Sequence, residues 1–336
     1  MKKYQFILGI DVSKKTLDLC LILTDHPLEK KAFNTTNTEK GYQAMLNWFK
    51  KQKLNIDTGL VVLEHTGIYS LVLCEFLDQQ QISYSLVSGL EVKRASGISR
   101  GKDDKKDAFM LAMYGYRHQD ELKPGMTKQA ELLQLQMLQA QRKRLVNNKK
   151  SLLLPVKELY QMNMEDKAIV LETNQCNVIE EINNSIKAIE QQIMEIIQNN
   201  EQLKKQYGLC TSIPGVGMQL TVSLIVTTGA FTLFKNSRQL ACFAGVAPFP
   251  YQSGTSIRGR NKVSHLADKE LKSLLHMASL NAVRADNQLK LYYQRKKAEG
   301  KNALLVLNTV RNKLLQRIMA VVDRGTPYVQ LAQHAA

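Results

Sequence analysis

Alternating apolar and polar positions at the start of the chain predict a β-strand that ends at an acidic residue. Every second residue from Tyr4 to Ile10 is apolar, and Asp11 follows at once. Similar patterns predict further strands at 16–23, 31–36, 59–63 and 84–87, and helices at 39–52, 69–80 and 105–118. In this order the first three strands form a meander, and the later strands, which follow crossover helices, pair in parallel.

Four acidic side chains are expected to converge on this fold, whose element order is that of the RNase H-like (RuvC-like) α/β type. Asp11 lies on the first strand, and Glu64 ends the fourth, which belongs beside the first. Asp104 and Asp107, three residues apart, share one helix face. Two carboxylates about 4 Å apart repel by roughly 4 kcal/mol at an effective dielectric of 20, so the pattern calls for divalent cations, Mg²⁺ or Mn²⁺. Asp103 is a rival for the third position, and Asp104 has a plainer alternative as a helix cap.

The middle of the chain predicts a long helical coiled-coil spacer. Between 179 and 196, isoleucines recur at a 3-4-3-4-3 spacing, which is an a/d seam. An upstream helix over about 130–153 is predicted to end before Pro155. The two helices either fold back on each other or pair with those of another subunit, and pairing between subunits is the favoured alternative.

The excess of positive charge lies in the last third of the chain. The chain has 46 Lys and Arg against 30 Asp and Glu, and residues 207–336 hold 17 of the former and 5 of the latter. Such a field suits a phosphate backbone, which is bound by counterion release; a basic surface kept for solubility is the alternative. We therefore predict an α/β domain at 1–125, the helical spacer at 126–206 and a basic, mainly α-helical domain at 207–336.

A glycine-rich turn marks this last domain as a candidate nucleic-acid binder. Gly215 and Gly217 precede an apolar helix predicted at 219–226. The segment has the look of a helix-hairpin-helix turn, in which backbone N–H groups hold a phosphate at a helix N-terminus. A plain turn remains the alternative.

A second segment of the same domain, 244–254, is predicted as an exposed loop because it is rich in small, turn-prone residues. Its Ser253 is followed by the cations Arg258, Arg260 and Lys262. Such a cluster would stabilise both a phosphate and a developing serine alkoxide. On residue chemistry alone, however, Ser253 is one of many loop serines. Further helices are predicted at 271–283 and 303–322.

Composition argues against several other classes of protein. The five cysteines stand singly and the six histidines show no HExxH spacing, so a zinc site or a disulfide framework is not expected. No apolar stretch is long enough to cross a bilayer, and the N-terminus lacks the pattern of a signal peptide. We expect a cytoplasmic protein without a membrane partner.

Taken together, the motifs resemble the DEDD-type insertion-sequence transposases, the family now described as RNA-bridged recombinases. The segments that carry the resemblance span nearly the whole chain in family order: Gly9–Lys14, Leu63–Tyr69, Gly101–Ala108, Ile213–Gly217, Gly245–Pro248 and Gln252–Gly254. In one departure, Asp103 stands where the family usually has Thr, so Asp103 shares the candidacy for the third acidic position.

The resemblance implies roles for particular residues. Asp11, Glu64, Asp104 and Asp107 become a metal-binding quartet, and Ser253 becomes a nucleophile that joins covalently to a DNA phosphate. It also implies a noncoding RNA from the same element that pairs with donor and target DNA. Finally, it implies a homo-oligomer, a dimer or tetramer, in which the acidic site of one subunit meets the serine of another.

Three other functions fit parts of the pattern. A hydrolytic nuclease or junction resolvase would use the acids to activate water and would form no protein–DNA adduct. A sugar kinase or actin-like ATPase would share the Gly9–Ser13 pattern, but it needs a second phosphate motif and an adenosine motif that the chain lacks. A DNA-binding protein with a dead nuclease domain is disfavoured by the intact quartet.

Overall fold

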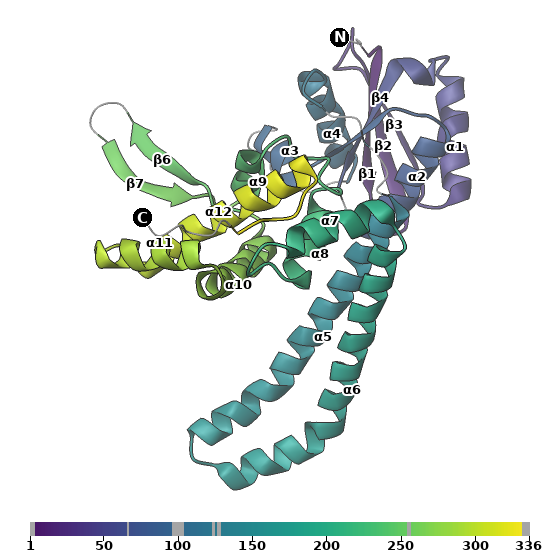
Figure 1. Cartoon of the computed structure of the whole chain (residues 1–336). Helices are drawn as coiled ribbons and strands as arrows, with labels where there is room; N and C mark the ends of the chain where they lie inside the picture. Colours follow the sequence, from purple (N-terminus) through teal and green to yellow (C-terminus); the bar gives the residue numbers. More distant parts are fainter. Residues whose placement is uncertain are drawn as a thin grey trace. The chain divides into compact units, whose positions relative to one another are not determined.

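The computed structural model describes residues 4–65, 67–95, 104–122, 125, 129–253 and 257–330, with the backbone alone at 104, 105, 253, 257, 258 and 260. The chain divides into two compact units, Met1–Thr127 and Lys128–Ala336. Each unit has its own elements, labelled in Figure 1.

The first unit is built on a five-stranded mixed sheet with the strand order β3-β2-β1-β4-β5. Its strands are β1 (Phe6–Val12), β2 (Thr16–Leu23), β3 (Lys30–Thr36), β4 (Gly59–Glu64) and β5 (Tyr84–Val87). The first three strands form an antiparallel meander, whereas β4 pairs in parallel with both β1 and β5. The predicted meander and the predicted place of the fourth strand beside the first are confirmed.

Helices cover both faces of this sheet (Figure 1). One face packs on α1 (Glu39–Lys51) and α2 (Leu71–Gln79), and the other packs on α4 (Asp104–His118). Because side chains alternate along a strand, Leu8 and Ile10 of β1 enter the first core while Ile7 enters the second. The short elements are η1 (Ile56–Thr58), η2 (Gly67–Tyr69) and α3 (Gly89–Ala95).

Glycines fix the place and direction of α4 on the sheet. A Cβ added to Gly9 would lie 2.2 Å from the Ala108 carbonyl oxygen and 2.4 Å from the Ala112 nitrogen, so helix and strand backbones touch here. One turn further along, a Cβ at Gly115 would meet Ile7. The helix therefore runs from the end of β1 toward its start, and its first turn lies at the strand end that carries Asp11.

The second unit is mainly α-helical. It begins with a long hairpin of α5 (Ala130–Gln161) and α6 (Glu165–Gln198), which Figure 1 shows running side by side. The remaining elements are α7 (Glu201–Thr211), α8 (Met218–Thr227), α9 (Ser237–Phe243), β6 (Pro248–Ser253), β7 (Ile257–Val263), α10 (Lys269–Ala285), α11 (Asn287–Ala298) and α12 (Ala303–Arg324). Apolar residues of α7, α8, α9, α10 and α12 form its main core.

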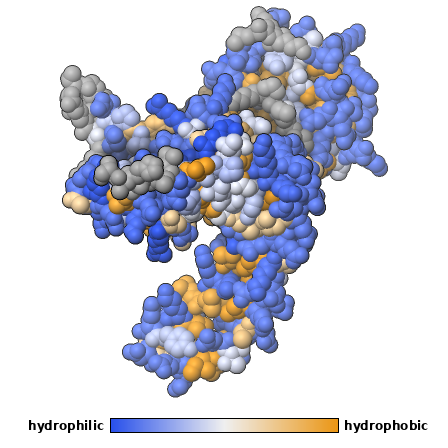
Figure 2. Space-filling model, viewed as in Figure 1, coloured by the Kyte–Doolittle hydropathy of each residue, from blue (hydrophilic) through white to orange (hydrophobic). Residues whose placement is uncertain are grey.

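The two spacer helices fold back on each other within the chain, which was the less favoured of the two predicted alternatives. Ile189 and Ile193 of the isoleucine seam are buried in one cluster with Leu132 and Leu135 of α5. Nearer the tip of the hairpin, apolar side chains are exposed (Figure 2), including those of Leu154, Met162, Ile169 and Val170.

The prediction that Pro155 interrupts the upstream helix is wrong, because α5 continues through it to Gln161. A proline removes one N–H and leaves the carbonyl four residues earlier, that of Ser151, without its helical partner. Both residues are exposed, so water can bind this carbonyl. The packing of α5 along α6 outweighs the remaining cost.

The expectation of an exposed loop at 244–254 is wrong for 248–253, which form strand β6, although 248–252 are exposed. β6 and β7 form an antiparallel hairpin with an irregularity between Phe249 and Tyr251. Both aromatic side chains are exposed, at 45% and 64%. A strand with no buried face has no alternation of apolar and polar residues, and this removes the signal on which strand prediction depends.

In the described residues, no helix is both long enough and apolar enough to cross a membrane.

Candidate functional site

Asp11 and Glu64 occupy matching positions at the C-terminal ends of neighbouring strands. Ile10 of β1 pairs with Leu63 of β4 in parallel register, and each acid is the next residue of its strand. Since Ile10 and Leu63 face α1 and α2, alternation turns both acids toward the α4 face. Both side chains are half-buried. Asp11 and Glu64 therefore lie at neighbouring strand ends, as the sequence predicted.

The first turn of α4 brings the other predicted acids to the same end of this face. Asp107 is half-buried and directly precedes Ala108, whose carbonyl touches β1 at Gly9. Asp104 is the first residue of α4; its side chain, like the whole of Asp103, lies outside the described residues. Among the described side chains, no group of three or more Asp, Glu, His or Cys is close enough to hold a metal ion.

Sequence reasoning missed a further acid, Asp18. It lies directly opposite Asp11 in the antiparallel β1–β2 pair, so both side chains point to the same face. Asp18 is 9% exposed, and its Oδ1 accepts a hydrogen bond of 2.8 Å from Asn34 Nδ2 on β3. Only the register of the first hairpin reveals this neighbour, and the sequence pattern did not establish that register.

These side chains suit a hard divalent cation rather than a soft one. Asp11, Glu64, Asp107 and Asp18 offer only carboxylate oxygens, which are the ligands that Mg²⁺ and Mn²⁺ prefer. Asp11 and Glu64 lie at the two strand ends and Asp107 lies in the first turn of α4. Asp104 is the first residue of the same helix. A cation held here would offset the mutual repulsion of the acids and supply positive charge to a phosphate.

The backbone at the start of α3 positions the Glu64 carboxylate. A Cβ added to Gly89 would lie 2.0 Å from Glu64 Oε1 and 2.6 Å from Cδ. No other residue type leaves this space, because every other side chain has a Cβ. The absence of a side chain at Gly89 thus determines the position of the Glu64 carboxylate.

We expect Gly89→Ala to weaken divalent-metal binding by about 10-fold or more, as is typical when a group that orients a metal ligand is changed. The added methyl displaces the Glu64 carboxylate, whose flexible side chain can yield without unfolding the sheet. Calorimetric titration with Mn²⁺ measures the affinity, and thermal unfolding checks the fold. Gly208→Ala is the matched control, since a Cβ there meets nothing within 4 Å. Unchanged affinity in Gly89→Ala would contradict the positioning role.

Ser253 is the last residue of β6 and pairs with Ile257 at the outer end of the β6–β7 hairpin. Its side chain lies outside the described part of the chain, as do residues 254–256. Of the predicted cations, Arg258 pairs with Gln252, Arg260 lies on β7, and the exposed Lys262 pairs with Phe249. The hairpin therefore carries the serine and three cations on adjacent strands.

A part-buried polar network holds the base of this hairpin. Asn308 Nδ2 donates to the Val246 carbonyl, 2.8 Å away, and Arg311 Nη1 donates to Asn308 Oδ1 at 3.4 Å. Arg311 is 9% exposed, and its Nη2 lies 2.7 Å from Nδ1 of His276. Burial, together with the adjacent Arg311 charge, lowers the pKa of His276 and favours the neutral ring that accepts this bond.

Gly215 and Gly217 turn out to have different surroundings. Gly215 has a φ of +89°, and a Cβ there would lie 2.5 Å from the Ala282 nitrogen, so it serves the packing of the turn on α10. Gly217 is exposed at the N-terminus of α8, with nothing within 4 Å of its Cβ position. Gly217 alone of the two borders open space.

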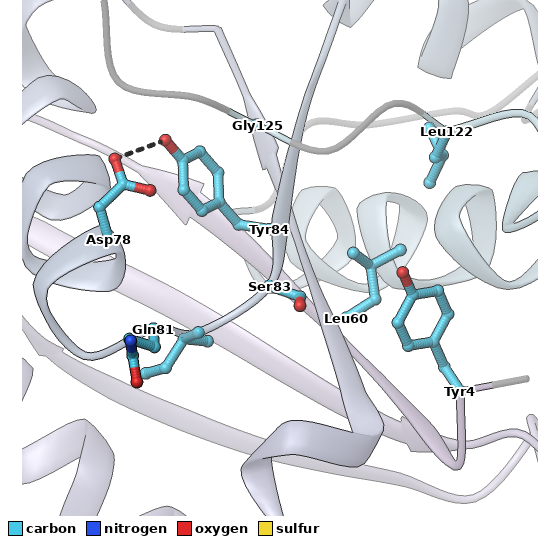
Figure 3. A pocket seen from close by; sticks show the side chains of 9 residues that line it. Tyr4, Leu60, Asp78, Gln81, Ser83, Tyr84, Leu122 and Gly125 are labelled. Atoms are coloured by element: carbon cyan, nitrogen blue, oxygen red, sulfur yellow. Dashed lines mark hydrogen bonds between the residues drawn. The ribbon is translucent and has the colours of Figure 1, made fainter. Parts of the chain in front are cut away.

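Figure 3 shows a small pocket of the first unit. It has a volume of about 270 Å³ and is lined by residues that include Tyr4, Leu60 and Tyr84. These residues stand just before β1 or at the starts of β4 and β5. Asp78 in the pocket accepts a hydrogen bond from the Tyr84 hydroxyl at 3.2 Å. Ligand sites on such sheets lie beyond the carboxyl ends of the strands, which is where Asp11 and Glu64 are.

Comparison with known proteins decides the family. Residues 8–159 match the DEDD domain of IS110 elements, described as a transposase, and residues 207–294 match a domain described as transposase IS116/IS110/IS902 family. Together the two matches cover most of the chain and both candidate sites. The chain belongs to the IS110/IS116/IS902 family of transposases. As an IS110 family transposase it is a DNA recombinase, and its DEDD-type domain indicates the use of divalent metal.

Individual proteins similar to this IS110 family transposase are consistent with the family assignment. The chain is 28% identical to the pilin gene-inverting proteins of Moraxella lacunata and Moraxella bovis, over 96% of the chain and 97% of each relative. It is 33% identical over 118 residues to an uncharacterized 43.6 kDa protein of insertion element IS110 from Streptomyces coelicolor, which is 35% of the chain and 29% of that protein.

Proposed function

We propose that this transposase cuts and rejoins DNA through a covalent bond between Ser253 and a DNA phosphate, assisted by a Mg²⁺ site at the acidic cluster. The observation that carries the proposal is the convergence of Asp11, Glu64 and the first turn of α4 at one end of one sheet face. This arrangement, in a chain matched by the DEDD domain, supports an RNase H-like (RuvC-like) fold with Asp11, Glu64, Asp104 and Asp107 as metal ligands.

The serine step conserves the phosphodiester. The Ser253 hydroxyl loses its proton and attacks the phosphorus; the P–O bond to the leaving strand breaks, and that strand departs as a free hydroxyl after taking up a proton. The hydroxyl of a new strand then attacks the same phosphorus and releases the serine. Because one phosphodiester replaces another at each step, no external energy source is needed. Arg258, Arg260 and Lys262, on the adjacent strand, would stabilise the charge on the phosphate.

Other parts of the proposal concern organisation and partners. The division into 1–125, 126–206 and 207–336 assigns the acids to the first part and the serine to the last. Donor and target DNA, bound partly at Gly217 and the β7 cations, would be paired by a noncoding RNA of the same element. The protein would act as a homo-oligomer, a dimer or tetramer, in the cytoplasm at the nucleoid. The near full-length similarity to proteins named for gene inversion supports DNA rearrangement as the outcome.

The test is a reaction of the full-length protein with a plasmid that carries the two ends of its own element, in Mg²⁺ and with the flanking RNA. We expect rejoined junctions that sequencing detects, without added nucleotide triphosphate. Products with free, unjoined ends alone would overturn the proposal and favour a hydrolytic nuclease. Omitting the RNA tests its role separately, since junctions formed equally well without it would remove that partner.

A further inference from the structure

A groove between α11 and α12 carries a second concentration of positive charge in the C-terminal part of the chain. Its volume is about 890 Å³, which is the size of a site for a nucleotide-sized ligand rather than for an isolated phosphate. Arg295, Lys313 and Arg317 supply its cations, and Tyr292 and Gln316 also line it. None of its lining residues belongs to the β6–β7 hairpin or to the turn before α8.

The charges of this groove are only partly neutralised from within. Residues 287–324 hold nine Lys and Arg but two Asp and Glu. Arg317 is paired with the fully buried Asp286 at 2.9 Å, and Arg295 lies 3.9 Å from Glu299. In the described part of the chain, no carboxylate forms an ion pair with Lys313, whose Nζ lies 5.0 Å from the centre of the Tyr292 ring. An anionic ligand would complete this arrangement.

Tyr292 adds a feature that a plain basic surface lacks. Lys313 Nζ and Arg295 Cζ lie 5.0 and 5.9 Å from its ring centre, so two cations are held next to one aromatic ring. Basic side chains combined with an aromatic ring are typical of sites that hold nucleic-acid strands. Tyr292 is packed partly against the main core of the unit, which fixes its ring in place.

We propose that the α11–α12 groove binds the phosphodiester backbone of a polynucleotide. This inference rests on the proposed function, in which the protein holds DNA and RNA, and it assigns one contact to a surface separate from the serine hairpin. Asp286 supports the groove in two ways. It caps α11 by accepting a 2.8 Å hydrogen bond from the Leu289 N–H, and its ion pair with Arg317 holds this groove cation in place. The groove is thus built before any ligand binds.

The experiment compares two charge-matched double variants of the full chain. Arg295→Gln with Lys313→Gln removes two groove cations, and Lys290→Gln with Lys297→Gln removes two exposed cations of α11 that do not line the groove. Binding to a short duplex DNA and to a structured RNA hairpin is measured over a series of salt concentrations. Thermal unfolding verifies that each variant is folded.

We expect the groove variant to bind more weakly. On duplex DNA, the plot of log K against log salt should also become less steep by about 1.8, because each lost contact removes about 0.9 from the magnitude of its slope. The control should change the slope much less. Loss on DNA alone, on RNA alone or on both identifies which strand the groove holds, and each supports the proposal. Equal effects of the two variants on both probes would overturn it. Failure of the wild-type protein to bind either probe would overturn both this proposal and the proposed function. Normal binding without strand exchange would overturn the proposed function alone.

Discussion

Replacing Asp11 with Asn abolishes strand exchange and leaves the first unit folded: this is the result that we expect. Asp11 lies beside Glu64 in the β1–β4 register and opposite Asp18 in the β1–β2 register. The change keeps the shape of the side chain and removes one negative charge from a crowded group, so it relieves repulsion rather than adding it. Loss of a metal ligand removes several kcal/mol of transition-state stabilisation, which is about a thousandfold in rate.

Recombinant junctions counted by sequencing measure the activity of Asp11→Asn, and Mn²⁺ titration measures its metal binding. Asp57→Asn is the matched control, because Asp57 is an exposed acid of η1 just before the start of β4, at the other end of that strand. The control should recombine and bind metal like the wild type. Full recombination by Asp11→Asn in Mg²⁺ would remove Asp11 from the metal site.

The second large effect is expected for Ser253→Ala, which should form no covalent protein–DNA adduct while it binds nucleic acid normally. Alanine lacks the hydroxyl that attacks the phosphorus, and no step of the proposed reaction proceeds without that bond. The backbone of Ser253 pairs with Ile257 across the hairpin, and alanine preserves this pairing. A reaction stopped with denaturant, followed by gel electrophoresis and peptide mapping, detects the adduct.

Ser256→Ala provides the comparison for the nucleophile, because it removes a hydroxyl from the same short segment and should retain the adduct. The peptide that carries DNA in the wild type should contain Ser253. An adduct in Ser253→Ala would transfer the role to Ser256, Tyr292 or Tyr293. Absence of an adduct even in the wild type would instead favour hydrolysis by metal-activated water.

The N-terminal half was largely predictable because its signals are local. Asp11 and Glu64 each follow an apolar run near the end of a strand, and the parallel crossover rule then places those two strand ends side by side. Asp18 was not predictable in the same way, since its position opposite Asp11 depends on the register of the β1–β2 hairpin. Gly89 gave no signal either, because its effect on Glu64 is a contact between residues 25 positions apart.

The C-terminal half was harder to predict for a different physical reason. The β6–β7 hairpin exposes Phe249 and Tyr251, so no buried face imposes a period of two on its sequence. The network that holds its base joins Val246 to Asn308 and Arg311, about 60 residues later. The charge of this region was visible at once, but the groove that gathers part of it depends on how α11 and α12 pack.

The α5–α6 hairpin has a consequence for how the chain can vary in length. The chain leaves along α5 and returns along α6, and where it re-enters the unit Asn200 Nδ2 donates to Glu131 Oε1 at the start of α5, 3.4 Å away. Contacts along the hairpin keep one register between its helices: Arg142 bonds Glu190 at 2.7 Å, and Lys149 and Asn183, each seven residues nearer the tip, also bond at 2.7 Å. Equal numbers of turns added to or removed from both helices near the tip would therefore leave Glu131 and Asn200 where they are. The α5–α6 hairpin can therefore be longer or shorter while the core formed by helices α7, α8, α10 and α12 stays unaltered.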